Sequence, residues 1–196
     1  PPRGGNPFMN GTKSLVAMVH GTDVPAMVER AIELIGGLEK LQLAGTRTLL
    51  KPNVVGGGAP PITTDPRVIQ AVGTLVQAEK PAALVVGEMS AIMALPTRPH
   101  LERTGMLQVA RAIGADVIAF DDEDWVEVHP PHVEHTTTVY VAKSAYEAER
   151  LISIPVIKTH RHASFSCALK NTVGCVHGKN KPWMYGTGWE AAVAEL

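Results

Sequence analysis

The stretch Thr48-Leu49-Leu50-Lys51-Pro52-Asn53 decides the fold, because an apolar run typical of a buried strand ends abruptly in polar residues. The pattern recurs downstream, where the apolar residues 151–157 run into Lys158-Thr159-His160. The carboxyl ends of parallel strands lie at one edge of an open sheet, and ligands of α/β proteins bind there. The chain therefore predicts the place of a site together with the fold.

Other apolar runs and amphipathic stretches surround this central pattern. Further strands are expected at residues 14–19, 82–86 and 116–120. One helix is expected to be capped by Thr22 or Asp23, and another to begin at Asp65-Pro66. Further helices are expected to cover much of 100–113 and a short stretch near 165–173. Residues 125–128 and 137–141 alternate as a hairpin does. The predicted class is α/β, with a mainly parallel central sheet, flanking helices in βαβ units and a small β-hairpin insertion.

Length and charge limit the function classes. The 196 residues carry 18 basic and 19 acidic side chains, so we expect no nucleic-acid partner. No apolar run approaches the roughly 20 residues that span a bilayer. Residues 1–12 are expected to form a flexible arm and 13–196 a single domain. The start lacks the basic region and apolar core of a signal peptide, which leaves cytoplasm, or export after removal of a signal, as alternatives.

Polar side chains gather at the expected strand exits, and they supply the candidate site. Ammonium groups at an apolar rim suit phosphate or carboxylate, or act as bases when burial lowers their pKa. A single lysine after a strand more often marks only a solvated strand end than a site. Two lysines in matching contexts make a site and a solvated strand end about equally good interpretations. The predicted catalytic residues are His160 and Lys158, and the predicted ligand-binding residues are Lys51, Asn53, Glu88, Lys170 and Asn171.

Histidines and cysteines offer weaker metal candidates. The set nearest the lysines is His160, His162, His177, Cys167 and Cys175. A second set, His129, His132 and His135, lies on a proline-broken loop whose spacing does not fix a tetrahedral geometry. Two cysteines are too few for a disulfide framework or a four-cysteine cluster, so two small residues beside a site are the simpler interpretation.

Five motifs occur in an order that resembles a known family. They are Leu49-Leu50-Lys51-Pro52-Asn53, Thr63-Thr64-Asp65-Pro66-Arg67-Val68, Val86-Gly87-Glu88, Ile154-Pro155-Val156-Ile157-Lys158-Thr159-His160 and Ala168-Leu169-Lys170-Asn171-Thr172-Val173-Gly174. Together they resemble the DUF362 family, an uncharacterised bacterial and archaeal group, over nearly the whole chain from about Ser14.

The resemblance implies little about function, because the family is named for the lack of one. Some members look fused to ferredoxin-type modules with four-cysteine motifs, and some carry twin-arginine export signals. This sequence shows neither, so cluster binding is not carried over to it. Members usually continue beyond the point that matches Leu196, so the chain resembles the N-terminal portion of a longer domain.

Three hypotheses follow. In the first, the chain binds an anionic small molecule and is an enzyme or a binding protein. Lys51, Lys158 and Lys170 then neutralise charge, two asparagines orient the ligand and His160 transfers a proton. In the second, it is a redox accessory beside a ferredoxin-like partner, with a metal or an iron–sulfur cluster that the partner supplies. In the third, it is a structural or assembly subunit, with homo-oligomers among its forms.

Overall fold

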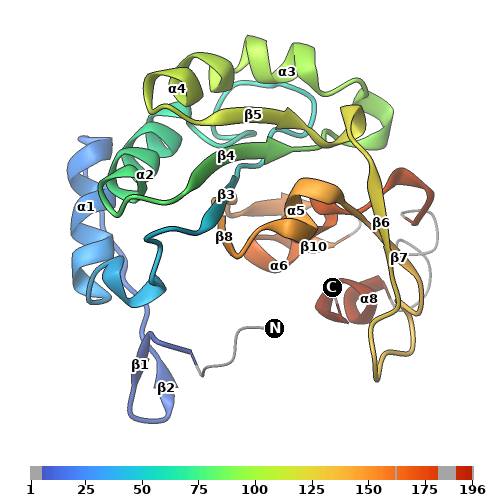
Figure 1. The fold of residues 1–196 in the computed structure, drawn as a ribbon, viewed down its shortest axis with the longest axis horizontal. Coiled ribbons are helices and arrows are strands. Elements are labelled where there is room, and N and C mark those ends of the chain that lie inside the picture. The colour runs from blue at the N-terminus through green and yellow to red at the C-terminus, as the bar shows by residue number, and fades with distance from the viewer. Residues whose placement is uncertain (1–5, 162, 181–188, 196) are drawn as a thin grey trace.

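A four-stranded parallel sheet forms the centre of the computed structural model, which describes residues 6–161, 163–180 and 189–195 (Figure 1). Its strands are β3 (Arg47–Lys51), β4 (Ala83–Glu88), β5 (Asp116–Ala119) and β8 (Arg150–Ser153). Their order is β5-β4-β3-β8. The predicted α/β class with a parallel sheet is confirmed.

The order of the strands reverses between β3 and β8. From β3 the chain adds β4 and then β5 on one side, and β8 later pairs with the opposite side of β3. Leu50 consequently lies between Val86 and Ile152. Ligand sites of open α/β sheets lie at such a switch point, outside the carboxyl ends of the strands.

The first helices begin where their caps predict. In α1 (Val24–Leu34) the Asp23 carboxylate accepts the Ala26 N–H at 3.1 Å, and in α2 (Pro66–Ala78) Asp65 accepts the Arg67 N–H at 2.9 Å. The single helix expected over much of 100–113 is wrong. It is divided into α3 (Arg98–Arg103) and α4 (Met106–Ala112), because Gly105 takes a left-handed φ of 78°.

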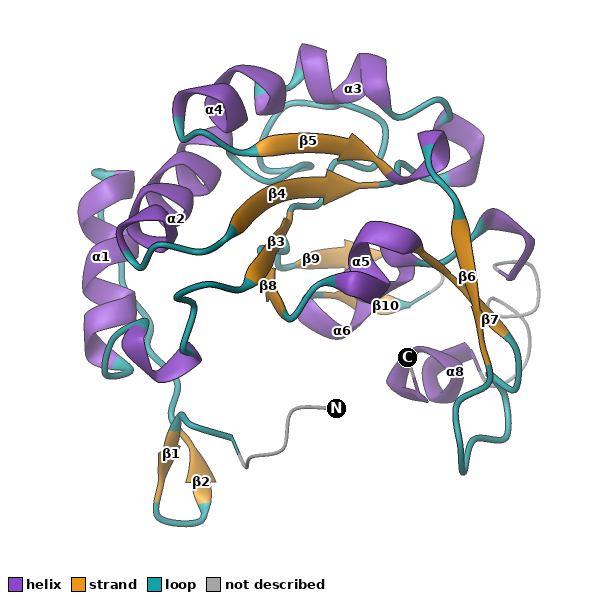
Figure 2. Ribbon diagram, viewed as in Figure 1, coloured by secondary structure: helices purple, strands orange, loops and turns teal. Residues whose placement is uncertain are grey.

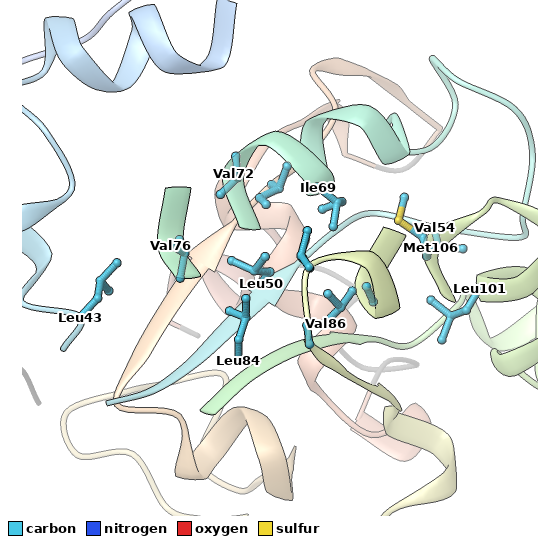
Figure 3. Close-up of a cluster of buried hydrophobic side chains, with 14 of the residues drawn as sticks. Leu43, Leu50, Val54, Ile69, Val72, Val76, Leu84, Val86, Leu101 and Met106 are labelled. Atoms are coloured by element: carbon cyan, nitrogen blue, oxygen red, sulfur yellow. The ribbon is translucent and has the colours of Figure 1, made fainter. Parts of the chain in front are cut away.

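The larger core lies between one face of the sheet and helices α2 and α4 (Figure 3). Leu50, Val86 and Ile69 are fully buried there. Burying a side chain of this size contributes about 1.5–3 kcal/mol, so this cluster is the main source of stability for the strands that carry the polar exits. Helix α1 packs on α2 and extends this layer outward.

The opposite face is covered by a hairpin and short helices (Figure 2). The predicted hairpin is confirmed as β6 (Trp125–Val128) paired with β7 (Val139–Ala142), followed by α5 (Lys143–Glu147). Leu49 packs here with Phe120 and Cys175. Short 3-10 turns occur at Glu39–Leu41, Ile92–Ala94, Phe120–Asp122, Thr172–Cys175 and Gly178–Asn180.

The segment after β8 differs from its prediction. The strand expected over 151–157 ends at Ser153, since the Ile154 N–H donates to the Lys51 carbonyl and Pro155 has no N–H to continue the ladder. The helix expected near 165–173 is shorter. Beyond β8 lie β9 (Lys158–His160), β10 (Ser164–Ser166) and α6 (Ala168–Asn171). The last helix of the described residues is α8 (Trp189–Glu195).

The strand expected at 14–19 is also wrong. Within the described chain, residues 15–20 join no sheet, and Val16 and Met18 are 79% and 91% exposed. Only a two-residue hairpin forms nearby, between β1 (Met9–Asn10) and β2 (Lys13–Ser14), so part of the predicted arm has structure. Among the residues described, no helix is both long and apolar enough to cross a membrane.

Candidate functional site

A buried polar network joins the exits of β3 and β4. The Lys51 ammonium, 1% exposed, forms an ion pair with Glu88 and donates to the Pro52 carbonyl at 2.9 Å. It also donates to the Asn171 side-chain oxygen at 3.2 Å. Three acceptors surround this ammonium, which is the condition under which a buried charge is tolerated.

Asn171 bridges β3 and β8, the paired strands on either side of the switch point. Its amide donates to the Lys51 carbonyl and to the Ser153 hydroxyl, both at 3.0 Å. Close by, Gly174 leaves no room for a side chain, because a Cβ there would lie 2.6 Å from the Lys51 ammonium and 3.2 Å from a Glu88 oxygen. The glycine lets the backbone cover the ion pair closely.

Lys158 stands on the cavity side of this network, in β9. Its ammonium donates to the Asn53 side-chain oxygen and to the Ile62 carbonyl, both at 2.6 Å. Partial burial lowers the pKa of Lys158, and the charge of Glu88 opposes that shift. Thr64 holds Asn53 in place by accepting its backbone N–H at 2.8 Å.

Lys170, in α6, lies among like charges. Burial lowers the pKa of Lys170 most, the ammonium groups of Lys158 and Lys51 lower it further, and Glu88 opposes them. The sequence expected Lys51, Lys158 and Lys170 to gather, and the fold brings them together around Glu88.

His160 has a defined tautomer. Its Nδ1 accepts the Ala163 backbone N–H at 3.1 Å, so the neutral ring carries its hydrogen on Nε2. A neutral ring held in this way offers a hydrogen-bond donor. For the proton-transfer role that the sequence suggested, His160 in this tautomer can donate from Nε2, and it can accept a proton only after loss of the Ala163 hydrogen bond.

These side chains surround a cavity of about 150 Å³, which we call the lysine cavity. Residues of β9, β10 and α6 contribute to its lining, and these three elements lie close together beside the central sheet (Figure 2). Lys51 is not one of its lining residues, although its ion-pair partner Glu88 is. The lining residues are Asn53, Val55, Glu88, Met89, Ser90, Ala91, Lys158, His160, Ser166, Lys170, Asn171, Val173 and Gly174.

Larger hollows occur elsewhere, and one of them shows why size alone does not choose the site. The hollow between α1 and α2 has about 460 Å³, and its charged groups include the exposed Arg30–Glu33 ion pair. Exposed pairs contribute little and bind anions weakly, since solvent screens them. The lysine cavity is therefore the candidate site despite its smaller size.

The metal candidates do not converge in the part of the chain that the structure describes. There, no group of three or more His, Cys, Asp or Glu side chains is placed to hold a metal ion. Cys175 is buried and Cys167 half-buried, and His177 contacts Trp125 edge-on. His162 lies outside the described residues. In the histidine-rich loop, the backbone N–H groups of residues 134–136 bind the Glu195 carboxylate.

Two contributors to the site escaped the sequence argument. The Ser153 hydroxyl accepts from Asn171, and the Ile62 carbonyl accepts from Lys158. Ser153 was the one polar residue inside an apolar run, which is a usable signal for a strand end. A main-chain carbonyl carries no signal in the identity of its residue.

The sheet and the lysine cavity define a class, an α/β protein with a basic cavity at the switch point of an open parallel sheet. Residues 48–196 match the family described as "Domain of unknown function (DUF362)". The chain therefore belongs to the DUF362 family, as its motifs implied.

One curated relative is the thylakoid-associated protein sll1697 of Synechocystis sp. (strain ATCC 27184 / PCC 6803 / Kazusa). The two proteins are 28% identical over 162 residues, which is 82% of this chain and 48% of the relative. The chain thus spans about half the length of that protein. No solved structure matches the chain.

Proposed function

We propose that the chain binds a small molecule bearing a phosphate or a carboxylate in the lysine cavity. One observation carries this proposal. Lys158 and Lys170 line the same cavity, and the charge of Lys158 is a cause of the lowered pKa of Lys170. An anion placed between the two ammonium groups would relieve that repulsion and replace part of the hydration that burial removes.

The size of the cavity favours a small ligand. About 150 Å³ corresponds to roughly five water molecules at about 30 Å³ each. Sites for drug-sized ligands occupy about 300–1,000 Å³, so a whole nucleotide does not fit. An inorganic oxyanion, a short organic acid, or the anionic end of a longer molecule does.

The geometry suggests different roles for the predicted residues. Lys158 and Lys170 would contact the anion, Asn53 would orient it through Lys158, and His160 would donate from Nε2. Lys51, which does not line the cavity, would hold Glu88 in position, and Asn171, which does line it, would hold the strand ends in position.

Isothermal titration calorimetry with inorganic phosphate and with oxalate, at constant ionic strength, tests the proposal. Lys158→Met should weaken binding by about tenfold to a hundredfold, the effect of losing one hydrogen bond to a charged group. The control is Lys13→Met, which removes the same charge from an exposed position in β2. Equal affinity in the two variants, or no binding of any small oxyanion by the parent chain, would count against the proposal.

The redox-accessory and assembly hypotheses stay open beside this one. Metal analysis of protein purified anaerobically without chelator tests the first, and the mass of the protein in solution tests the second. Either result is independent of the calorimetry.

A further inference from the structure

Three amines gather at the lysine cavity, and their surroundings differ. The Lys51 nitrogen donates to a carboxylate and to two other oxygens, so its charged form is fully satisfied. The Lys158 nitrogen donates to two neutral oxygens at short range, and this fixes its position. Lys51, whose charge is paired with Glu88, therefore suits the role of a permanent cation, and Lys158, held by two hydrogen bonds at the cavity, suits that of a positioned donor to an anion.

Lys170 is placed differently, since both of those cations act on it. It lines the cavity from α6 and is half-buried, so it is accessible to a ligand there. Burial and the charges of Lys158 and Lys51 lower its pKa, which raises the share of its neutral form at a given pH. A desolvated lysine beside another cation is a known way to obtain an amine nucleophile.

We propose that Lys170 is an amine nucleophile that forms an imine with a small carboxylate carrying a ketone or aldehyde group. This inference rests on the proposed anion site, whose remaining cation, Lys158, would hold the carboxylate. The short reach of the cavity, about 150 Å³, matches an acid of a few carbon atoms.

The step balances without a further reactant. The neutral Lys170 nitrogen attacks the carbonyl carbon, so a C–N bond forms, the C=O π bond breaks, and one hydrogen of the amine passes to the carbonyl oxygen. The C–O bond of the resulting carbinolamine then breaks, the oxygen leaves as water with the second hydrogen of the amine, and the imine remains. His160, whose Nε2 carries the hydrogen in the neutral ring, would donate a hydrogen bond to the oxygen as charge develops on it.

Reductive trapping tests the inference. The chain is incubated with pyruvate or glyoxylate and sodium cyanoborohydride, which reduces an imine to a stable secondary amine, and the modified lysines are mapped by peptide mass spectrometry. We expect the adduct on Lys170, its loss in Lys170→Arg, and no change in Lys13→Arg. Mapping on the parent chain decides the question even if Lys170→Arg does not fold.

The pH dependence of labelling separates a site from chance reactivity. Surface lysines of ordinary pKa, about 10.4, react little at neutral pH. The ratio of the labelling of Lys170 to the labelling of other lysines should be several-fold at neutral pH. This ratio should approach one as the pH rises toward about 10.4. Labelling spread evenly over the exposed lysines at neutral pH would overturn the inference.

Calorimetry with phosphate and oxalate on the same preparation distinguishes the two proposals. Anion binding without an adduct on Lys170 overturns the imine and leaves the anion site intact. Absence of both binding and adduct overturns both proposals. Binding together with a Lys170 adduct supports both.

Discussion

The end of β3 and the start of β9 carry the same kind of residue in opposite circumstances. Lys51 is the last residue of β3 and is 1% exposed, with Glu88 as its ionic partner. Lys158 opens β9, is partly exposed, and donates to two neutral oxygens. The comparison teaches that a lysine at a strand end belongs either to the structural framework or to a surface that meets a ligand. A lysine with a buried carboxylate partner, such as Lys51, belongs to the framework.

The strongest way to break this comparison is Lys51→Met. Removing one partner of a buried ion pair leaves the other charge uncompensated, so we expect a loss of about 3–5 kcal/mol in the free energy of unfolding, measured with urea. The double variant Lys51→Met with Glu88→Leu should recover most of that loss, because no unpaired charge remains. A single variant as stable as the parent would show that the pair is not part of the framework.

Gly174→Ala tests the close cover over the same pair. The new Cβ would lie 2.6 Å from the Lys51 ammonium, so the variant should lose about 1–3 kcal/mol, the range for overpacking in a core. Gly178→Ala is the matched control, since its Cβ meets only Ile92 atoms at 3.6 Å or more. Equal urea midpoints for the two variants would contradict the packing described.

Lys158→Met should change the free energy of unfolding much less, by under about 1 kcal/mol. The lowered pKa of Lys158 means that the folded state disfavours its ammonium, so removing the charge offsets the lost hydrogen bonds. A loss of unfolding free energy as large as that of Lys51→Met would show that Lys158 belongs to the framework as Lys51 does.

The smallest effect should appear at alkaline pH. The folded-state pKa values of Lys158 and Lys170 are lowered, so between those values and about 10.4 the unfolded chain binds more protons than the folded one. Stability from these groups should therefore rise with pH through that window. Across this pH window the urea midpoint of Lys170→Met should rise less than that of the parent. An equal rise would contradict a lowered pKa of Lys170 in the folded state.

The elements that form the sheet were predictable because each carries a local signal. The apolar run 48–50 predicts a strand, and the pair Asp65-Pro66 predicts the start of a helix. Both elements occur in the structure. The errors have physical causes. Val16 and Met18 look like strand residues but have no neighbouring strand in the described chain, and Gly105 divides a helix whose apolar pattern runs on.

The sequence could predict which residues lie close together at the site. It could not predict which of them would be structural and which would face the cavity. The sequence places Lys51, Lys158 and Lys170 at one edge once the strands are parallel. It could not show that Lys51 turns inward to Glu88, because that depends on contacts between residues far apart in the chain. The contact of Lys158 with a main-chain oxygen has no side-chain pattern at all.

The Asn171 bridge has a consequence for the order of folding. It joins Lys51 to a residue 120 positions later, and the Lys158–Asn53 contact spans 105 positions. Loops of this length close late, after local helices and neighbouring strands have formed. The lysine cavity therefore does not exist until the last third of the chain has docked. A ligand that binds there cannot speed folding, and it should instead slow the unfolding of a chain that is already complete.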